Sequence, residues 1–176
     1  MAGSARISER LAKRPHRYLI ALGSNMRHAR LGSPRAVIAA ALEELGRAGI
    51  TVLAAAPVIA SAPLGPSRRR YANSAALIAT ALPPECLLER LQHIEGAYGR
   101  RRRGQRWGAR VLDLDVVLWS AGAWASRPLT IPHPRYRERT FVLAPATRIA
   151  PRWRDPVTGF TVRQLYARLT RSNPLP

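Results

Sequence analysis

The segment from Val111 to Trp119 constrains the fold of this chain more than any other part of the sequence. Its side chains alternate between two sets, Leu112, Leu114, Val116 and Leu118 in one and Val111, Asp113, Asp115 and Val117 in the other. A period of two residues is that of a β-strand, in which successive side chains point to opposite faces of a sheet. The pattern therefore predicts a strand with one apolar face and two carboxylates on the other face.

Asp113 and Asp115 are an unusual pair for a strand. Strands disfavour aspartate, and two carboxylates on one face repel each other unless a cation lies between them. The chain has only 10 acidic residues, so placing two of them together on a core strand favours a specific role. We expect the pair to bind Mg²⁺, which takes carboxylates, waters and substrate phosphates as ligands. The alternative is a pair of solvated carboxylates on an exposed strand face.

Arginines are concentrated immediately before this strand, between Gly99 and Arg110. Guanidinium groups bind phosphate oxygens through paired hydrogen bonds, and Trp107 offers a flat face to an aromatic ring. Gly104 and Gly108 give the backbone freedom to move. We expect this segment to close as a lid over a phosphate-bearing substrate. A solvated basic loop and a nucleic-acid contact are the alternatives.

The composition limits the possible classes of protein. A net charge of +19, from 29 Lys and Arg against 10 Asp and Glu, indicates either an anionic partner or the arginine-rich bias of a GC-rich genome. Cys86 is the single cysteine, which excludes an internal disulfide and an all-cysteine metal site and favours the cytoplasm. No apolar run approaches the roughly 18 residues of a membrane span, so we expect no membrane partner.

The remaining segments predict one folded domain. We expect strands at 17–22, 50–61, 71–81 and 111–119, and helices at 33–46, 83–98 and 161–169. Segment 126–140 contains three prolines and is predicted to be irregular, and Pro145 and Pro151 are predicted to break the chain after 141–143. This order predicts an α+β fold, a three-layer α/β/α sandwich around a ferredoxin-like, mainly antiparallel sheet. Residues 1–16 are predicted to be a basic disordered extension, 17–170 the domain and 171–176 a tail.

Three smaller groups of residues are ambiguous when taken alone. Gln92 and Glu95 lie one helical turn apart, and from spacing alone we expect both to be solvent-exposed. His133 lies between two prolines in a basic segment that suits phosphate contact, with a structural role as the alternative. Tyr71 and Asn73 follow a Pro- and Gly-containing loop and would form a small pocket, where an asparagine amide supplies both a donor and an acceptor.

Together these motifs resemble one family, the 6-hydroxymethyl-7,8-dihydropterin pyrophosphokinases, over residues 17–169. Residues 21–25 resemble the first strand and turn of the family, and residues 61–65 with 71–73 resemble its pterin-binding segment. The segment from Arg106 to Asp115 is similar to the family signature, and residues 129–135 match the segment that follows it. The chain departs from better-known members between Gly65 and Tyr71, where the loop is shorter and more basic.

The resemblance implies transfer of pyrophosphate from ATP to the hydroxymethyl group of the pterin, with release of AMP, in folate biosynthesis. It implies that Asp113 and Asp115 hold two Mg²⁺ ions and act in catalysis with Arg100 and Arg110. The implied ATP-binding residues are Gln92, Glu95, Arg102, Arg106, Trp107, Arg110, Leu129, Thr130, His133 and Arg139. The implied pterin-binding residues are Ser61, Ala62, Pro63, Leu64, Tyr71, Asn73, Trp107 and Phe141. We expect a monomer that acts on these two small molecules.

Two other classes of protein fit part of the sequence. A ferredoxin-like nucleic-acid-binding module would suit the positive charge, but no strand carries the run of Gly and aromatic residues that stacks on bases. A glycosyltransferase would use an Asp-x-Asp pair to bind a metal–nucleotide complex. The chain is short for that class and lacks a Gly-rich nucleotide-binding turn after its first strand.

Overall fold

A computed structural model describes residues 15–61, 71–99 and 111–171 of the chain. The predicted extension and tail therefore lie almost wholly outside the described residues, and the domain limits stay predictions. Within the described residues, no helix has the length and apolar character that crossing a bilayer requires.

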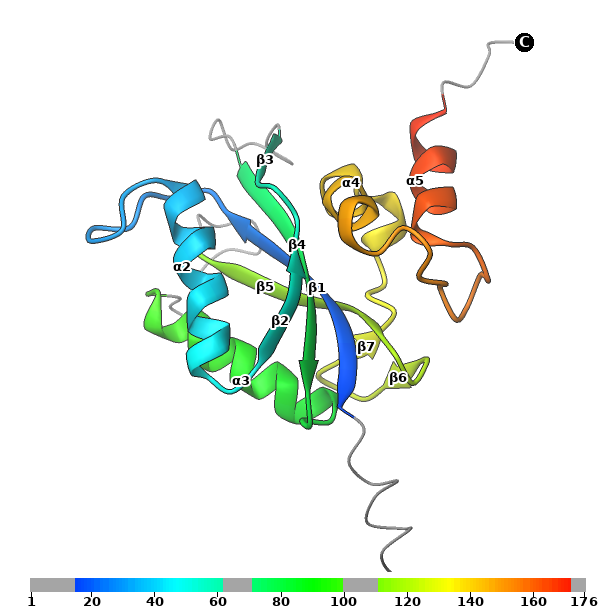
Figure 1. Ribbon diagram of the computed structural model, residues 1–176, viewed down its shortest axis with the longest axis horizontal. Helices are drawn as coiled ribbons and strands as arrows, with labels where there is room; N and C mark the ends of the chain where they lie inside the picture. Colours follow the sequence, from blue (N-terminus) through cyan, green and yellow to red (C-terminus); the bar gives the residue numbers. More distant parts are fainter. Residues whose placement is uncertain (1–14, 62–70, 100–110, 172–176) are drawn as a thin grey trace, which may run out of the picture.

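A five-stranded antiparallel sheet forms the centre of the fold (Figure 1). Its strands are β1 (His16–Ser24), β2 (Thr51–Ala55), β3 (Ile59–Ser61), β4 (Tyr71–Thr80) and β5 (Asp113–Trp119). They run in the order β2-β4-β1-β5. Strand β3 also pairs with β4, on the same side as β2 but nearer the start of β4. Together with α2 (Pro34–Arg47) after β1 and α3 (Pro84–Ala97) after β4, this confirms the predicted ferredoxin-like core.

Helices cover both faces of the sheet, which confirms the three-layer prediction (Figure 1). Helices α2 and α3 pack on one face over an apolar core that includes Tyr18, Ile20 and Leu22 of β1. On the other face, α4 (Thr140–Ile149) and α5 (Val162–Thr170) pack over a second core that includes Leu19 of the same strand. Strand β1 thus contributes alternate residues to two separate cores, as its continuous apolar sequence requires.

Both predicted helices of the first layer begin where the sequence indicates. Ser33 caps α2 by accepting a hydrogen bond from the Ala36 backbone N–H at 3.3 Å, and Pro34 occupies the first turn. Helix α3 begins at Pro84 and buries Leu87, Leu91 and Ile94 against the sheet.

Four local predictions were wrong. The strand predicted at 50–61 is split into β2 and β3, because Pro57 has no N–H to donate to β4. The segment predicted to be irregular contains a hairpin of β6 (Trp124–Ala125) and β7 (Thr130–Ile131), followed by the 3₁₀ helix η1 (Tyr136–Glu138). Helix α4 continues through Pro145, whose ring is buried with its apolar face.

The fourth error concerns the alternation along β5. The pairing with β1 shifts register between Leu19 and Ile20, which lie opposite Leu118 and Val116. The extra residue is Val117, and this bulge turns Leu118 to the second core instead of the first. The two aspartates lie before the bulge, so the prediction that they share a face holds.

Candidate active site

One row of residues across the sheet brings together two parts of the predicted site. Gly23 of β1 lies opposite Asn73 of β4 on one side and opposite Asp113 of β5 on the other. A Cβ added at Gly23 would lie 3.6 Å from Asn73 Oδ1 and 4.0 Å from Asp113 Cβ. The amide predicted to bind the pterin and the first predicted metal ligand are thus separated by a residue without a side chain.

The next row on the same face is also built from small residues. Ala21 of β1 lies opposite Ala75 of β4 and opposite Asp115 of β5. We call Ala21, Gly23 and Ala75 the small-residue floor. Asn73 borders this floor at one side and the two aspartates border it at the other.

Arg139 and Phe141 approach the floor from the start of α4. A guanidinium nitrogen of Arg139 lies 3.9 Å from a carboxylate oxygen of Asp115, and about a quarter of the Arg139 side chain is exposed. The same guanidinium lies 5.7 Å from the centre of the Phe141 ring. Phe141 and Ala21 both pack against the second core. One predicted ATP ligand and one predicted pterin ligand therefore meet next to the aspartates.

His133 is fixed to β5 by its backbone, since its N–H donates to the Val117 carbonyl at 3.0 Å. Burial lowers the pKa of its imidazole, and the nearby Arg139 guanidinium lowers that pKa further. The Nδ1 atom accepts a hydrogen bond from the Arg135 backbone N–H at 3.2 Å. His133 is therefore neutral at pH 7 with its proton on Nε2, which can donate to a ligand oxygen.

On the β4 side, Asn73 is buried and donates through Nδ2 to Ser61 Oγ at 2.7 Å. Ser61 of β3 lies opposite Tyr71 of β4, whose side chain is half-buried. Three of the predicted pterin ligands thus come together at the end of two paired strands. The hydrogen bond orients the Asn73 amide, as a residue that reads a heterocycle requires.

Glu95 is buried, so the expectation of solvent exposure from spacing was wrong for it. Its Oε1 accepts a hydrogen bond at 2.8 Å from the backbone N–H of Leu114, the residue between the two aspartates. A signal was present, because Glu95 continues the buried i, i+4 row of Leu87 and Leu91 on α3. Gln92, one turn earlier, is half-buried.

The other predicted residues are placed less informatively. Leu129 is buried in the first core, and Thr130 is exposed on β7. Eight predicted ligands lie outside the described residues: Ala62, Pro63, Leu64, Arg100, Arg102, Arg106, Trp107 and Arg110.

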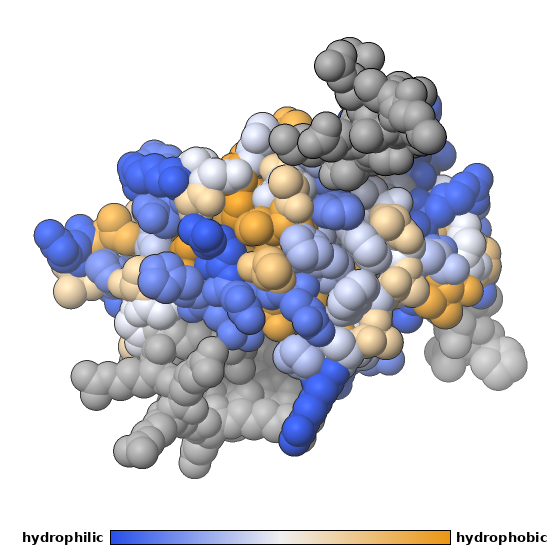
Figure 2. All heavy atoms as spheres, turned by 90° about the horizontal axis from the view of Figure 1, so that it is seen from below, coloured by the Kyte–Doolittle hydropathy of each residue, from blue (hydrophilic) through white to orange (hydrophobic). Residues whose placement is uncertain are grey.

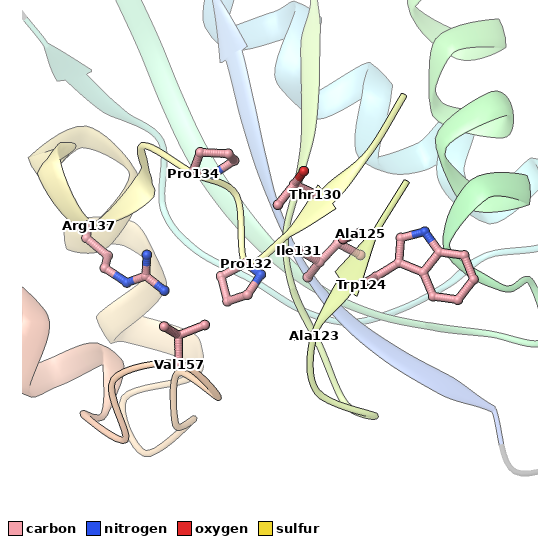
Figure 3. Close-up of a pocket in the computed structure, with 9 residues that line it drawn as sticks. All are labelled: Ala123, Trp124, Ala125, Thr130, Ile131, Pro132, Pro134, Arg137 and Val157. Carbon is pink, nitrogen blue, oxygen red and sulfur yellow. The ribbon is translucent and has the colours of Figure 1, made fainter. Parts of the chain in front are cut away.

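A pocket of about 570 Å³ lies beside residues 130–134 (Figure 3). It is lined by Ala123, Trp124, Ala125, Thr130, Ile131, Pro132, Pro134, Arg137 and Val157. Neither Asp113 nor Asn73 lines it, so it is separate from the small-residue floor.

The donor set at the floor suits a hard cation that is shared with a substrate. Among the described residues, no three His, Cys, Asp or Glu side chains gather as a complete metal cage. Asp113 and Asp115 lie on one face, and as ligands of Mg²⁺ they would leave other coordination positions to phosphate oxygens and water, as Mg²⁺ prefers.

Comparison with known proteins identifies the family of the chain. Residues 19–151 match the model of the 7,8-dihydro-6-hydroxymethylpterin-pyrophosphokinase family. Proteins named 2-amino-4-hydroxy-6-hydroxymethyldihydropteridine pyrophosphokinase are similar to this chain in sequence. The one from Pseudomonas aeruginosa is 41% identical over 80% of this chain and 84% of its own length, and the one from Methylorubrum extorquens is 39% identical over 89% and 95%.

Solved structures agree on the fold. The chain resembles a Plasmodium falciparum HPPK-DHPS protein with a TM-score of 0.67 at 11% identity, covering 88% of this chain and 42% of that one. A second HPPK-DHPS structure, in complex with substrates, gives a TM-score of 0.70 at 9% identity and covers 89% and 43%. This chain thus spans less than half of these solved chains. The family match and the identities above 35% show that the chain belongs to the 7,8-dihydro-6-hydroxymethylpterin-pyrophosphokinase family.

Proposed function

We propose that this protein uses Mg²⁺ and ATP to pyrophosphorylate 6-hydroxymethyl-7,8-dihydropterin at the small-residue floor. The products are AMP and the pterin diphosphate, a step of folate biosynthesis, and family membership supports this reaction. The single observation that supports the location is the register that sets Asn73 and Asp113 on either side of Gly23.

The geometry suits a reaction between a flat heterocycle and a polyphosphate. Adjacent strands lie about 4.8 Å apart, so the backbones of Asn73 and Asp113 stand roughly 10 Å apart, and the missing side chain at Gly23 would let a flat ring lie over the floor between them. The pterin hydroxyl oxygen bonds to the β-phosphorus of ATP and loses its proton to solvent water. The bond from that phosphorus to the oxygen bridging to the α-phosphate breaks, and AMP leaves with this oxygen.

Each group of residues has a distinct task in this proposal. Asn73 and Ser61 orient the ring, with Tyr71 and Phe141 as aromatic walls. Asp113 and Asp115 would hold Mg²⁺, which would supply positive charge to stabilise the transferred phosphate groups. His133 and Arg139 bind the nucleotide, and Gln92 and Glu95 support it from α3. Arg100 and Arg110, which lie outside the described residues, are proposed to stabilise the charge that develops on the polyphosphate.

We further propose that the enzyme is a cytoplasmic monomer with these two small molecules as its partners and no nucleic-acid partner. The single cysteine supports a reducing compartment.

AMP formation from ATP tests the proposed function directly. With Mg²⁺ present, AMP should form only when 6-hydroxymethyl-7,8-dihydropterin is added, and no ADP should appear. EDTA in excess should stop the reaction, and added Mg²⁺ should restore it, because the two carboxylates bind the substrate phosphates only through the cation. Pterin-dependent ADP, or unchanged AMP formation in EDTA, would contradict the proposal.

Gly23 offers a prediction about substrate fit. Gly23→Ala adds a methyl group whose contacts with Asn73 and Asp113 are ordinary, so the fold should be kept. Both variants should raise the KM for the pterin, and Gly23→Val should raise it more than Gly23→Ala because its side chain is larger. We expect rises between about 5-fold and 100-fold, since overpacking costs about 1–3 kcal/mol.

Steady-state kinetics with each substrate varied in turn would check this prediction. Gly46→Ala is the matched control, because a Cβ at Gly46 meets nothing within 4 Å and the residue lies on α2. An unchanged pterin KM in Gly23→Val would place the ring elsewhere than above the floor.

A further inference from the structure

Asp155 is a fully buried carboxylate outside the candidate site, in the loop between α4 and α5. One of its oxygens accepts a hydrogen bond from the Tyr136 hydroxyl at 2.7 Å and another from Arg137 Nε. The other oxygen accepts from Arg137 Nη2 at 2.9 Å and from the Val157 backbone N–H at 2.8 Å. A second backbone donor, the Thr158 N–H, lies 3.3 Å from this same oxygen. Two neighbouring side chains are therefore directed at one carboxylate.

The loop holds this carboxylate in a fixed place. The Asp155 backbone N–H donates to the Phe160 carbonyl at 2.9 Å, and the Gly159 N–H donates back to the Asp155 carbonyl at 2.9 Å. Thr161 then caps α5 through a reciprocal capping box with Gln164. Burial alone would raise the pKa of the Asp155 carboxyl, but the hydrogen bonds from Arg137 and Tyr136 hold the pKa below its usual range. Asp155 is thus ionised and anchored at neutral pH.

Tyr136 and Arg137 form most of the short helix η1, and the residues that flank η1 belong to the candidate site. His133 precedes it, and its carbonyl accepts from the Tyr136 N–H at 3.2 Å. Arg139 follows it and donates its N–H to the Tyr136 carbonyl at 3.2 Å. The Arg137 guanidinium also lies 5.1 Å from the centre of the Tyr136 ring, so the two side chains approach Asp155 as one unit. The position of η1 therefore sets the positions of both predicted nucleotide ligands.

We propose that Asp155 is a positioning residue for ATP, which orients His133 and Arg139 through its bonds to Tyr136 and Arg137. This inference rests on the proposed function and adds a residue to it that touches no substrate. The Asp155 carboxylate would affect nucleotide affinity indirectly. Residues that orient a binding side chain influence the affinity of the site in addition to the binding side chain itself. A role confined to holding α5 against α4 and η1 would lower stability and leave nucleotide affinity unchanged.

Asp155→Asn is the first variant to test, because it keeps the volume of the side chain and removes its charge. We expect the KM for ATP to rise roughly 10-fold, the lower end of what loss of an orienting partner costs, with the pterin KM within about twofold of wild type. Tyr136→Phe removes one hydrogen bond and keeps the buried ring, so it should cause a smaller rise of the same kind. Equal rises in both KM values would overturn the proposal.

Direct binding separates this inference from the proposed function. Calorimetry with the non-cleavable α,β-methylene-ATP should show weaker binding to Asp155→Asn, whether or not the enzyme forms AMP. The matched control is Arg154→Gln, which removes a guanidinium that bonds to the Gly159 carbonyl in the same loop and leaves η1 untouched. Its affinity should equal that of wild type. Wild-type affinity in Asp155→Asn would overturn the positioning role, while absence of AMP from the wild-type enzyme would overturn the proposed function.

A triple variant adds a stringent test. In a protein that already carries His133→Ala and Arg139→Ala, Asp155→Asn should weaken nucleotide binding no further, because the residues it orients are gone. An additive loss would mean that Asp155 acts by another route and would overturn the proposal.

Discussion

Asp113→Ala and Asp115→Ala should each lower the turnover of ATP to AMP by about 10³-fold, the upper end of the effect of removing one preorganised electrostatic group. The loss follows from the position of both carboxylates on one face of β5, where they would hold the cation that binds the polyphosphate. Affinity for the pterin should be largely kept, because Asn73 and Ser61, the proposed pterin ligands, lie on β4 and β3. Turnover at saturating substrate and pterin binding by fluorescence would measure the two effects separately.

Stability measurements distinguish a catalytic loss from a folding defect. Removing one of two neighbouring like charges relieves repulsion, whereas Asp115→Ala also loses the ion pair with Arg139, so the unfolding temperature of each variant should stay close to that of wild type in the absence of metal. Glu43→Ala is the control, since Glu43 is an exposed acid on α2 that pairs with Arg47. Near-normal turnover in either aspartate variant would refute the metal role of that residue.

Glu95→Ala should produce the second large effect, on stability and activity together. The Leu114 N–H would lose its acceptor inside the protein, and an unsatisfied buried group of this kind costs about 1–3 kcal/mol. Because Leu114 lies between Asp113 and Asp115, turnover should also fall by about 10-fold or more, as loss of a residue that orients ligands does. Urea unfolding followed by a kinetic assay would measure both.

Two further variants serve as controls for Glu95→Ala. Glu95→Gln keeps an oxygen that can accept from Leu114, so it should recover most of the stability that Glu95→Ala loses. Glu89→Ala removes an exposed carboxylate from the same helix and should behave as wild type. If Glu95→Ala unfolds like wild type, its bond to Leu114 does not stabilise β5.

Local sequence signals predicted much of the fold because they act over short distances. The alternation in β5, the Ser33 cap and the apolar rows of α2 and α3 are set by neighbours within one or two turns. The order of these elements was enough to predict the ferredoxin-like sheet. The bulge at Val117 depends on how β5 meets β1, and no pattern within β5 reveals it.

In the candidate site, too, some features could be predicted from the sequence and others only from the fold. Resemblance supplied the identities of the predicted ligands, but not the arrangement that places Gly23 between Asn73 and Asp113. Gly23 and Asn73 are 50 positions apart along the chain, and Asn73 and Asp113 are 40 positions apart. Only the pairing of the strands brings the three residues together. The row of Leu87 and Leu91 on α3 indicates that Glu95 is buried, but not which group it contacts. The contacts of Glu95 with Leu114 and of Asp155 with Tyr136 each span 19 positions, and no local pattern predicts them. Hydrogen bonds of this range appear only once the fold is known.

Strand β5 forms one end of the main path of the sheet, where an unpaired strand edge can recruit another chain. Here that edge is engaged at two points: the Leu114 N–H bonds to Glu95, and the Val117 carbonyl accepts from His133. Charged aspartates on the same strand further discourage pairing with a second sheet. Residues proposed to serve the reaction thus also limit the pairing of this edge with another chain. Substitutions that remove them are therefore expected to lower solubility as well as activity.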